Sequence, residues 1–393
     1  MGEATAAGRN ILVFADGTAN EGGLLPDETR TNVYKLYRAT RVGPENGIDP
    51  DRQLAFYISG VGTPTPGAAT SWRAKLREGI DQTFGIGLGG KIVECYVAII
   101  SAWRPGDRIY LFGFSRGAYT VRCLAHVLEL MGIPPKKTDG ASISLDPKDL
   151  YPIAEDAVKI FYRHGETTKD DSARDAEAVV FRQKHASNCA PDDLTVPYFM
   201  GVWDTVAAEG WDRFFPGHDE EHRPKGIMYI RHALAIDEYR KDFARVKWGG
   251  SGTARQRVGD EPEPFQQVWF SGCHADVGGG YPENESRLSD VSLEWMVDFA
   301  TKELPEGCRI YVDVRYLNLH PSAAGMMHDE CMSGKVPWDK KVRPVPAEGT
   351  LHSSVLERLK MPEVRNYLTY GPYRPANLQE HPQAQAFFKN SSA

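Results

Sequence analysis

Residues 108–131 read RIYLFGFSRGAYTVRCLAHVLELM, and they join an apolar run, a glycine-flanked serine and an amphipathic segment. The run 108–112 has the length of a buried strand, whereas the segment 118–131 repeats apolar residues at helical spacing. The pentapeptide between them fits the pattern G-x-S-x-G, with Ser115 at its centre. A strand, this pentapeptide and a helix in succession are typical of a nucleophile elbow, a sharp turn that lifts a serine hydroxyl clear of the backbone. The alternative is a serine that only caps the helix.

Short apolar runs also occur on both sides of this segment, and helical patterns separate several of them. Strands that alternate with helices form parallel sheets covered on both faces. We therefore predict an α/β fold, with an α/β-hydrolase-like, mostly parallel sheet flanked by helices and carrying lid-type insertions. The predicted strands are 10–15, 53–58, 108–112, 196–202, 267–270 and 309–314, and the predicted helices are 90–103, 118–131, 152–163 and 292–302.

The predicted catalytic domain spans residues 10–300, and a C-terminal extension, residues 301–393, is expected to pack on its core. Two segments rich in charge and turn residues, 134–194 and 209–226, are predicted insertions. The second insertion contains three large aromatic residues, Trp211, Phe214 and Phe215. These aromatic residues are candidates either for an acyl-binding lid or for a plain hydrophobic contact with the core.

The composition is that of an ordinary globular protein. The 393 residues are 41% hydrophobic and 25% charged, and 46 basic against 53 acidic residues leave a net charge of −7. This charge argues against a nucleic-acid partner. The N-terminus lacks the apolar stretch of a secretory signal, and the six cysteines show no C-x-x-C pair. We expect a cytoplasmic protein that leaves the cell only through a non-classical secretion system.

A nucleophilic serine requires a base, and the base requires a carboxylate to orient it. Asp204 follows the predicted strand 196–202, and His274 follows the predicted strand 267–270. The chain order Ser, Asp, His is that of α/β-hydrolases and differs from the chymotrypsin and subtilisin orders. A single aspartate after a strand is usually a turn residue, so the prediction depends on all three residues together. His232 is the competing base, but it lies in a helical pattern and is interpreted as a buried, hydrogen-bonded histidine.

Acyl transfer also requires backbone N–H groups that stabilise an oxyanion. One donor is expected from Arg116, the residue after the nucleophile, and a second from the loop after the first strand, at Gly17 or Thr18. Asp16 precedes this loop, and we interpret it as a turn residue that orients the loop by accepting its N–H groups.

Two further motifs resemble cofactor or metal sites but fail the corresponding templates. The glycine cluster 85–90, GIGLGG, has neither the Lys-Ser/Thr ending of a phosphate loop nor a buried strand before it. Residues 218–222, HDEEH, carry Asp where H-E-x-x-H has Glu, and they are flanked by prolines that oppose a helix. We therefore predict no cofactor and no metal.

Six motifs in this order resemble a widespread α/β-hydrolase family that includes the phospholipase and lipase effector catalytic domains of type VI secretion. They are FADGT (14–18), NVYKL (32–36), YISGVGT (57–63), GFSRGA (113–118), GVWDTV (201–206) and HADVGGGY (274–281). The resemblance covers about residues 10–300. It implies an α/β-hydrolase fold, a Ser115–Asp204–His274 triad and hydrolysis of esters, including those of phospholipids.

Together, these observations predict a serine esterase or lipase that is phospholipase A-like and forms an acyl-enzyme. The expected substrate is a small-molecule or lipid ester, with at most transient membrane contact and no nucleic acid. Two alternatives are left open. One is a metal-dependent hydrolase with Asp16, Asp276 or His274 as ligands, and the other is a non-catalytic binding protein on the same fold.

Overall fold

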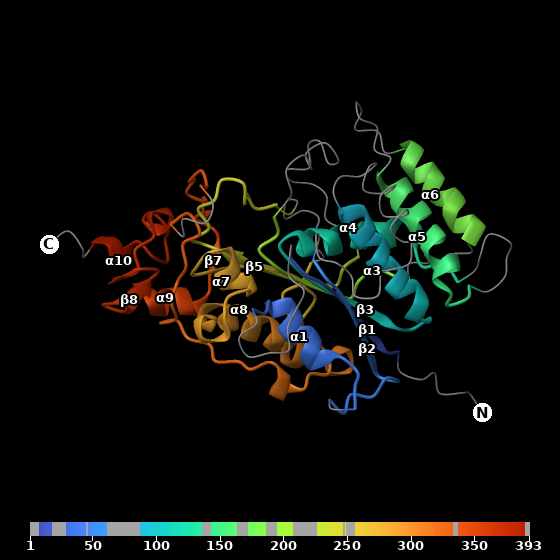
Figure 1. Ribbon diagram of the computed structural model, residues 1–393, viewed down its shortest axis with the longest axis horizontal. Coiled ribbons are helices and arrows are strands. Elements are labelled where there is room, and N and C mark those ends of the chain that lie inside the picture. Colours follow the sequence, from blue (N-terminus) through green and yellow to red (C-terminus); the bar gives the residue numbers. More distant parts are fainter. Residues whose placement is uncertain are drawn as a thin grey trace.

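A parallel β-sheet forms the centre of the molecule (Figure 1). The computed structural model describes residues 8–17, 29–44, 46–60, 87–135, 143–162, 172–185, 195–206, 226–246, 248, 256–332 and 337–389. Within these ranges the sheet has seven strands in the order β2-β1-β3-β4-β5-β6-β7, and every neighbouring pair is parallel. The strands are β1 (Asn10–Ala15), β2 (Gln53–Ile58), β3 (Arg108–Phe114), β4 (Phe199–Trp203), β5 (Tyr229–Ala235), β6 (Phe265–Phe270) and β7 (Thr350–Leu351).

The strand order reverses at β1, which lies between β2 and β3. In open parallel sheets, ligands bind beyond the carboxyl ends of the strands at such a switch point. The register places Ala15 opposite both Ile58 and Gly113. The residues that follow β1 and β3, Asp16 and Ser115, therefore lie at the same edge of the sheet.

Helices cover both faces of the sheet (Figure 1). On one face, α3 and α4 pack against the strands, with α5 and α6 outside them, while α1 and α8 cover the opposite face. These helices are α1 (Asn32–Thr40), α3 (Leu88–Ala102), α4 (Arg116–Met131), α5 (Pro147–Tyr162), α6 (Ser172–His185) and α8 (Arg287–Asp298). None of the helices in the described part of the chain has the length and apolar character needed to cross a membrane.

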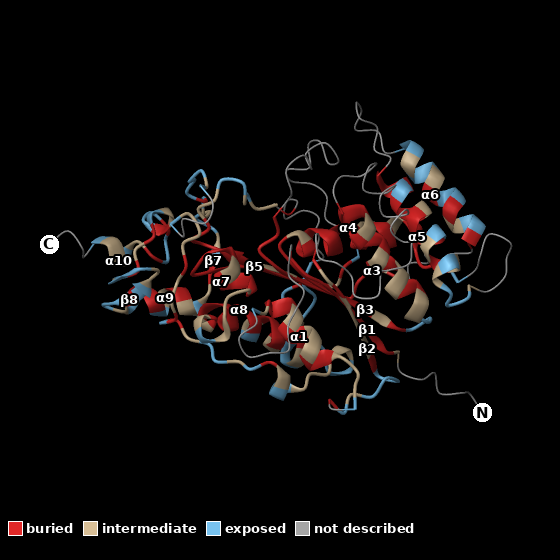
Figure 2. Ribbon diagram, viewed as in Figure 1, coloured by how far each residue is buried: buried red, intermediate tan, exposed pale blue. Residues whose placement is uncertain are grey.

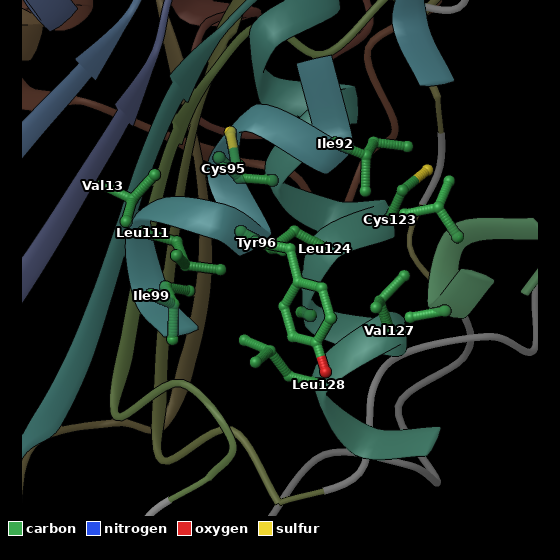
Figure 3. Packing of buried hydrophobic residues seen from close by; sticks show 14 of the residues in the cluster. Val13, Ile92, Cys95, Tyr96, Ile99, Leu111, Cys123, Leu124, Val127 and Leu128 are labelled. Atoms are coloured by element: carbon green, nitrogen blue, oxygen red, sulfur yellow. The ribbon is translucent and has the colours of Figure 1, made fainter. Parts of the chain in front are cut away.

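The central strands β1 and β3 are almost wholly buried, which explains why they read as continuous apolar runs. All six residues of β1 and all seven of β5 are buried, and Figure 2 shows the sheet as the buried centre of the molecule. Between the sheet and its helices, Val13 and Leu111 pack toward Ile99 of α3 and Leu124 and Leu128 of α4 (Figure 3). This apolar contact fixes α4, and with it Ser115, against the sheet.

The predicted α/β architecture is confirmed, but two predictions of local structure are wrong. The helical pattern around His232 is the strand β5, because a strand with two buried faces shows no period of two. Residues 309–313 belong to no strand of the described sheet, and Val314 begins a short 3-10 helix, Val314–Tyr316. Instead, the Ile310 N–H bonds to the Ala300 carbonyl and the Tyr311 N–H bonds to the Gln53 side chain.

The two predicted insertions differ in what the structure describes. Most of residues 134–194 that it describes form α5 and α6, whose apolar residues, including Ile153, Phe161 and Phe181, join the core beside α4. This segment therefore adds an outer helical layer. Almost all of the second insertion, including its three aromatic residues, lies outside the described residues.

The C-terminal extension contacts the catalytic core along β6. Its short strand β7 pairs with β6, with Leu351 opposite Trp269. Its helix α9 (Ser353–Lys360) adds Val355 and Leu359 to a third hydrophobic cluster around Trp269. The pairing of β7 with β6 and the cluster around Trp269 pack the extension against the core. The domain boundary at residue 300 stays a prediction.

The close approach of β1 to α4 gives a test of this packing. A Cβ on Gly117 would lie 2.1 Å from the Ala15 carbonyl oxygen and 2.5 Å from that of Asp16. Both obstacles are backbone atoms, so we expect Gly117→Ala to lower the free energy of unfolding by about 3 kcal/mol. The matched control is Gly90→Ala inside α3, where a Cβ would meet nothing within 4 Å and should be neutral or stabilising. Urea unfolding of both variants measures the difference, and equal effects would contradict this account.

Candidate active site

Ser115 lies at the turn between β3 and α4 with a strained backbone. Its φ of 58° and ψ of −125° lie outside the regions that a residue with a Cβ usually adopts. The Ser115 N–H donates to the Trp203 carbonyl at 3.1 Å, which ties the turn to the end of β4. A Cβ on Gly113 would lie 2.6 Å from the Gly117 carbonyl oxygen, so the two glycines allow the tight turn. This geometry is that of a nucleophile elbow.

Asp204 follows β4 and is completely buried. Its Oδ2 lies 2.7 Å from His274 Nδ1, and its Oδ1 accepts the Ala235 N–H at 3.1 Å. Oδ1 also accepts from Arg343 Nη1 at 2.5 Å. Burial acts to raise the pKa of Asp204, but the Arg343 charge and the His274 hydrogen bond outweigh it and hold the pKa below its ordinary value. Asp204 is therefore an ionised carboxylate that can orient an imidazole.

His274 is the first residue of the short helix α7 (His274–Gly278), just beyond β6. Its backbone N–H donates to the buried carboxylate of Glu238 at 3.1 Å. The ring packs against Phe114 and Phe243, with centroid separations of 4.5 and 5.1 Å. With Nδ1–H donated to Asp204, Nε2 is the acceptor nitrogen of the neutral ring. Among the described residues Nε2 is buried and has no hydrogen-bond partner.

The structure brings the three predicted triad residues to one edge of the sheet. Asp204 and His274 are directly bonded, and Phe114, the residue before Ser115, packs on the His274 ring. No hydrogen bond joins Ser115 to Nε2 in this structure, and such catalytic bonds often tighten only when substrate binds.

Asp16 binds the first residue of the loop that follows β1, which agrees with its interpretation as a turn residue. Oδ1 accepts the Gly17 N–H at 2.7 Å, and Oδ2 accepts the hydroxyls of Thr31 and Tyr57, each at 2.7 Å. Burial raises the pKa of Asp16 to about 6, although all three hydrogen bonds act to lower it. Because the Gly17 N–H is already donated to Asp16, its use as an oxyanion donor stays a prediction. Thr18, the alternative donor, lies outside the described residues.

Arg116 is the first residue of α4. The N–H groups of the first helical turn have no acceptor within their own helix, and they point beyond the helix N-terminus. The Arg116 N–H therefore has no acceptor within α4, and its use as an oxyanion donor stays a prediction.

His232, the competing base, is occupied by structural hydrogen bonds. Its Nδ1 accepts the Trp248 indole N–H at 2.8 Å, and its Nε2 lies 3.3 Å from Thr205 Oγ1. Burial lowers the pKa of His232 to about 3, and the Arg122 charge acts in the same direction. These contacts agree with its interpretation as a buried, hydrogen-bonded histidine.

Asp276, one of the alternative metal ligands, is also engaged. It accepts the backbone N–H groups of Cys273 and His328 and lies 2.7 Å from His328 Nδ1. In the part of the chain that the structure describes, no group of three or more His, Cys, Asp or Glu side chains is arranged to hold a metal ion. The HDEEH motif lies outside these residues.

Sequence reasoning missed two charged residues that contact the Asp204–His274 pair. Glu238 is three residues beyond β5, and Arg343 is 139 residues from Asp204 in the chain. A charged residue just past a buried strand could have suggested Glu238. Nothing in the sequence around Arg343 links it to the catalytic motifs.

The parallel sheet, the strained serine and the neighbouring Asp–His pair define an α/β-hydrolase-like protein. Residues 9–299 match the model of the T6SS phospholipase effector Tle1-like catalytic domain, and the chain belongs to this family. The match begins one residue before β1 and ends within the π-helical turn that follows α8.

Individual relatives are more distant. The chain is 28% identical to the uncharacterized protein YEL023C of Saccharomyces cerevisiae over an alignment of 251 residues. This alignment covers 62% of this chain and 33% of the yeast protein. An uncharacterized protein from Pseudomonas aeruginosa aligns with 17% identity and a TM-score of 0.43, over 81% of this chain and 49% of that one. The Tle1 effector bound to the VgrG spike of the type 6 secretion system aligns with 19% identity and a TM-score of 0.35, over 72% and 53%. The chain thus spans about a third to a half of the length of these relatives.

The buried carboxyl of Asp16 provides a test by pH. Its folded-state pKa of about 6 exceeds the ordinary 3.8, so the folded protein holds an extra proton between these values. The contribution of this group to stability therefore falls as the pH rises from about 4 to about 6. Asp16→Asn removes this dependence, so its free energy of unfolding relative to wild type should increase by about 2 kcal/mol between pH 4 and pH 7. Urea unfolding at both pH values measures the change, and a constant difference would contradict it.

Proposed function

We propose that this protein is a serine hydrolase that cleaves carboxylic esters, with the acyl esters of lipids and phospholipids as the favoured substrates. The observation that carries the proposal is the 2.7 Å contact between His274 Nδ1 and Asp204 Oδ2, which leaves Nε2 as an acceptor at the sheet edge that presents Ser115. The family, whose model describes phospholipase effectors, supports the lipid substrate.

In the proposed reaction, Ser115 Oγ attacks the ester carbonyl carbon while His274 Nε2 takes the hydroxyl proton. The imidazolium then returns this proton to the alcohol as the C–O bond breaks, which leaves the acyl group on Ser115. Water hydrolyses this acyl-enzyme by the same proton route. Asp204 holds the ring in the required tautomer and stabilises its charged form, since it is already ionised when the proton arrives.

The oxyanion of each tetrahedral intermediate would be stabilised by the Arg116 N–H at the N-terminus of α4, where the helix dipole also favours negative charge. The Gly17 loop is the proposed second source of donors. Removing one such donor costs about 3–4 kcal/mol of transition-state stabilisation in a comparable hydrolase. The aromatic rings of Phe114 and Phe243 pack against the His274 ring and would help to hold its orientation.

Recruitment of a lipid substrate must come from local apolar surface. A net charge of −7 gives no general attraction to anionic membranes. We therefore propose only transient membrane contact. The family further suggests export by type VI secretion from the cytoplasm of the producing cell, with partners on that route.

The nucleophile can be tested directly with a fluorophosphonate probe, which forms a covalent adduct with activated serines. Wild type should be labelled at Ser115 and should hydrolyse p-nitrophenyl esters, whereas Ser115→Ala should lose labelling and at least about 10³-fold in kcat. Ser101→Ala is the matched control, because that hydroxyl bonds to the Ala98 carbonyl of its own helix. Wild-type rates in Ser115→Ala would contradict the proposal.

The assignment of the base can be tested by comparing two histidines. His274→Ala should lower kcat by at least about 10³-fold for the folded fraction, because it removes the proton carrier. His232→Gln should lower the melting temperature, because it disturbs the buried bonds to Trp248 and Thr205, yet keep kcat within about threefold for the folded fraction. Ester hydrolysis and thermal unfolding measure both effects. The opposite pattern would make His232 the base.

A further inference from the structure

We infer that Arg343, in the C-terminal extension, is a positioning residue for the catalytic carboxylate. The residues beyond the matched domain would then complete the active site. This inference rests on the proposed function, because it assumes that Asp204 orients His274 for catalysis.

Arg343 is buried and contacts three fixed acceptors. Its Nη1 donates to Asp204 Oδ1 at 2.5 Å and lies 3.2 Å from the Ala235 carbonyl oxygen, while its Nη2 donates to the Phe243 carbonyl at 2.6 Å. The Ala235 N–H donates to the same Asp204 oxygen. Oδ1 is therefore held from two sides, and Oδ2 is left to face His274 Nδ1.

Two donors on Oδ1 matter because a carboxylate held by one bond can rotate about its χ2 torsion. Such rotation would move Oδ2 away from the imidazole and release the tautomer that catalysis needs. Arg343 also holds the Phe243 backbone, and the Phe243 ring lies 5.1 Å from the His274 ring. The Arg343 guanidinium thus holds both the Asp204 carboxylate and the backbone of Phe243, whose ring packs against His274.

Charge gives a second reason. An isolated carboxylate in a fully buried position is strongly destabilised, and it would take up a proton or leave the site. The Arg343 guanidinium is permanently charged, so it offsets the charge of Asp204 whatever the protonation state of His274. Arg343 therefore keeps Asp204 ionised in the resting enzyme.

Arg343 is itself held in place by bonds between the extension and the end of β5. The Asn377 side chain donates to both the Arg343 and the Ile236 carbonyls, each at 2.9 Å. A short antiparallel contact nearby pairs Arg240 with Lys340, and the Lys341 N–H donates to the Tyr239 carbonyl at 2.8 Å. These bonds hold the backbone at Arg343 and just before it, and thereby fix the position of its guanidinium.

The competing explanation is that Arg343 only stabilises the fold. Arg358 offers a matched control, because it is a fully buried arginine of the same extension. Its guanidinium bonds to the carbonyls of Ala323, Gly325 and Arg365, all within the extension. Loss of Arg358 should therefore lower stability without reaching the Asp204–His274 pair.

The experiment compares Arg343→Met, Arg343→Lys and Arg358→Met in the full chain, with a short-chain p-nitrophenyl ester as substrate and the melting temperature as a check on folding. We expect Arg343→Met to lower kcat about 10- to 100-fold with KM changed less than about threefold. This loss is smaller than the roughly 10⁴-fold loss caused by altering a triad aspartate itself. Arg343→Lys, which retains the charge, should recover at least part of the loss. Arg358→Met should lower the melting temperature and keep kcat within about threefold for the folded fraction.

A double-mutant cycle gives the decisive readout. If Arg343 acts through Asp204, adding Arg343→Met to Asp204→Ala should lower kcat no further, whereas independent effects would multiply. Unchanged kcat in Arg343→Met, an equal loss in Arg358→Met or multiplicative losses in the cycle would each overturn the inference. If Arg343→Met does not fold, the same cycle is run with Arg343→Lys. Failure of the proposed function is distinguishable, because the wild type would then show no probe adduct at Ser115.

Discussion

The buried negative charge of Asp204 is the interaction on which the site depends. A carboxylate with no solvent exposure must find partners within the protein, and Asp204 finds them in three separate parts of the chain. The end of β5 provides the Ala235 N–H, α7 provides His274, and the extension provides Arg343. Each partner therefore has to arrive in the correct place before the charge can be buried. This requirement links the edge of the sheet to segments far apart in the sequence.

The strain at Ser115 is the second constraint, and the surrounding packing offsets it. A non-glycine residue with positive φ costs about 1–3 kcal/mol, and such a residue persists only when its surroundings fix it. Here β3 pairs on both sides, α4 packs on the sheet, and the Ser115 N–H is bonded to the end of β4. Asp204 also has a positive φ, at the corresponding place after the neighbouring strand. The two strained residues thus lie side by side where the chemistry is proposed.

Local sequence patterns predict much of the fold and the nucleophile elbow. Contacts between residues that are far apart in the sequence cannot be predicted in this way. The elbow is a local feature, because its strand, two glycines and helix are contiguous from residue 108 to residue 131. The helical interpretation of β5 is wrong because both faces of this strand are buried. The segment 309–314 is mistaken for a strand because Ile310 and Val312 pack on the core without joining the sheet. Arg343 could not be predicted, because its partner is set by the folding of the extension and by no spacing in the sequence.

The end of the family match at residue 299 does not coincide with an end of the packed structure. Beyond it, His328 bonds to Asp276 in the helix that begins with His274, and Tyr373 shares the Asp237 carboxylate with the Gly272 N–H. The extension thus contacts α7 and the loops that follow β5 and β6. Without these residues β6 would become an edge strand, and the buried Trp269 would lose the cluster that covers it. The physical unit that holds Asp204 and His274 in register therefore includes both the matched domain and the extension.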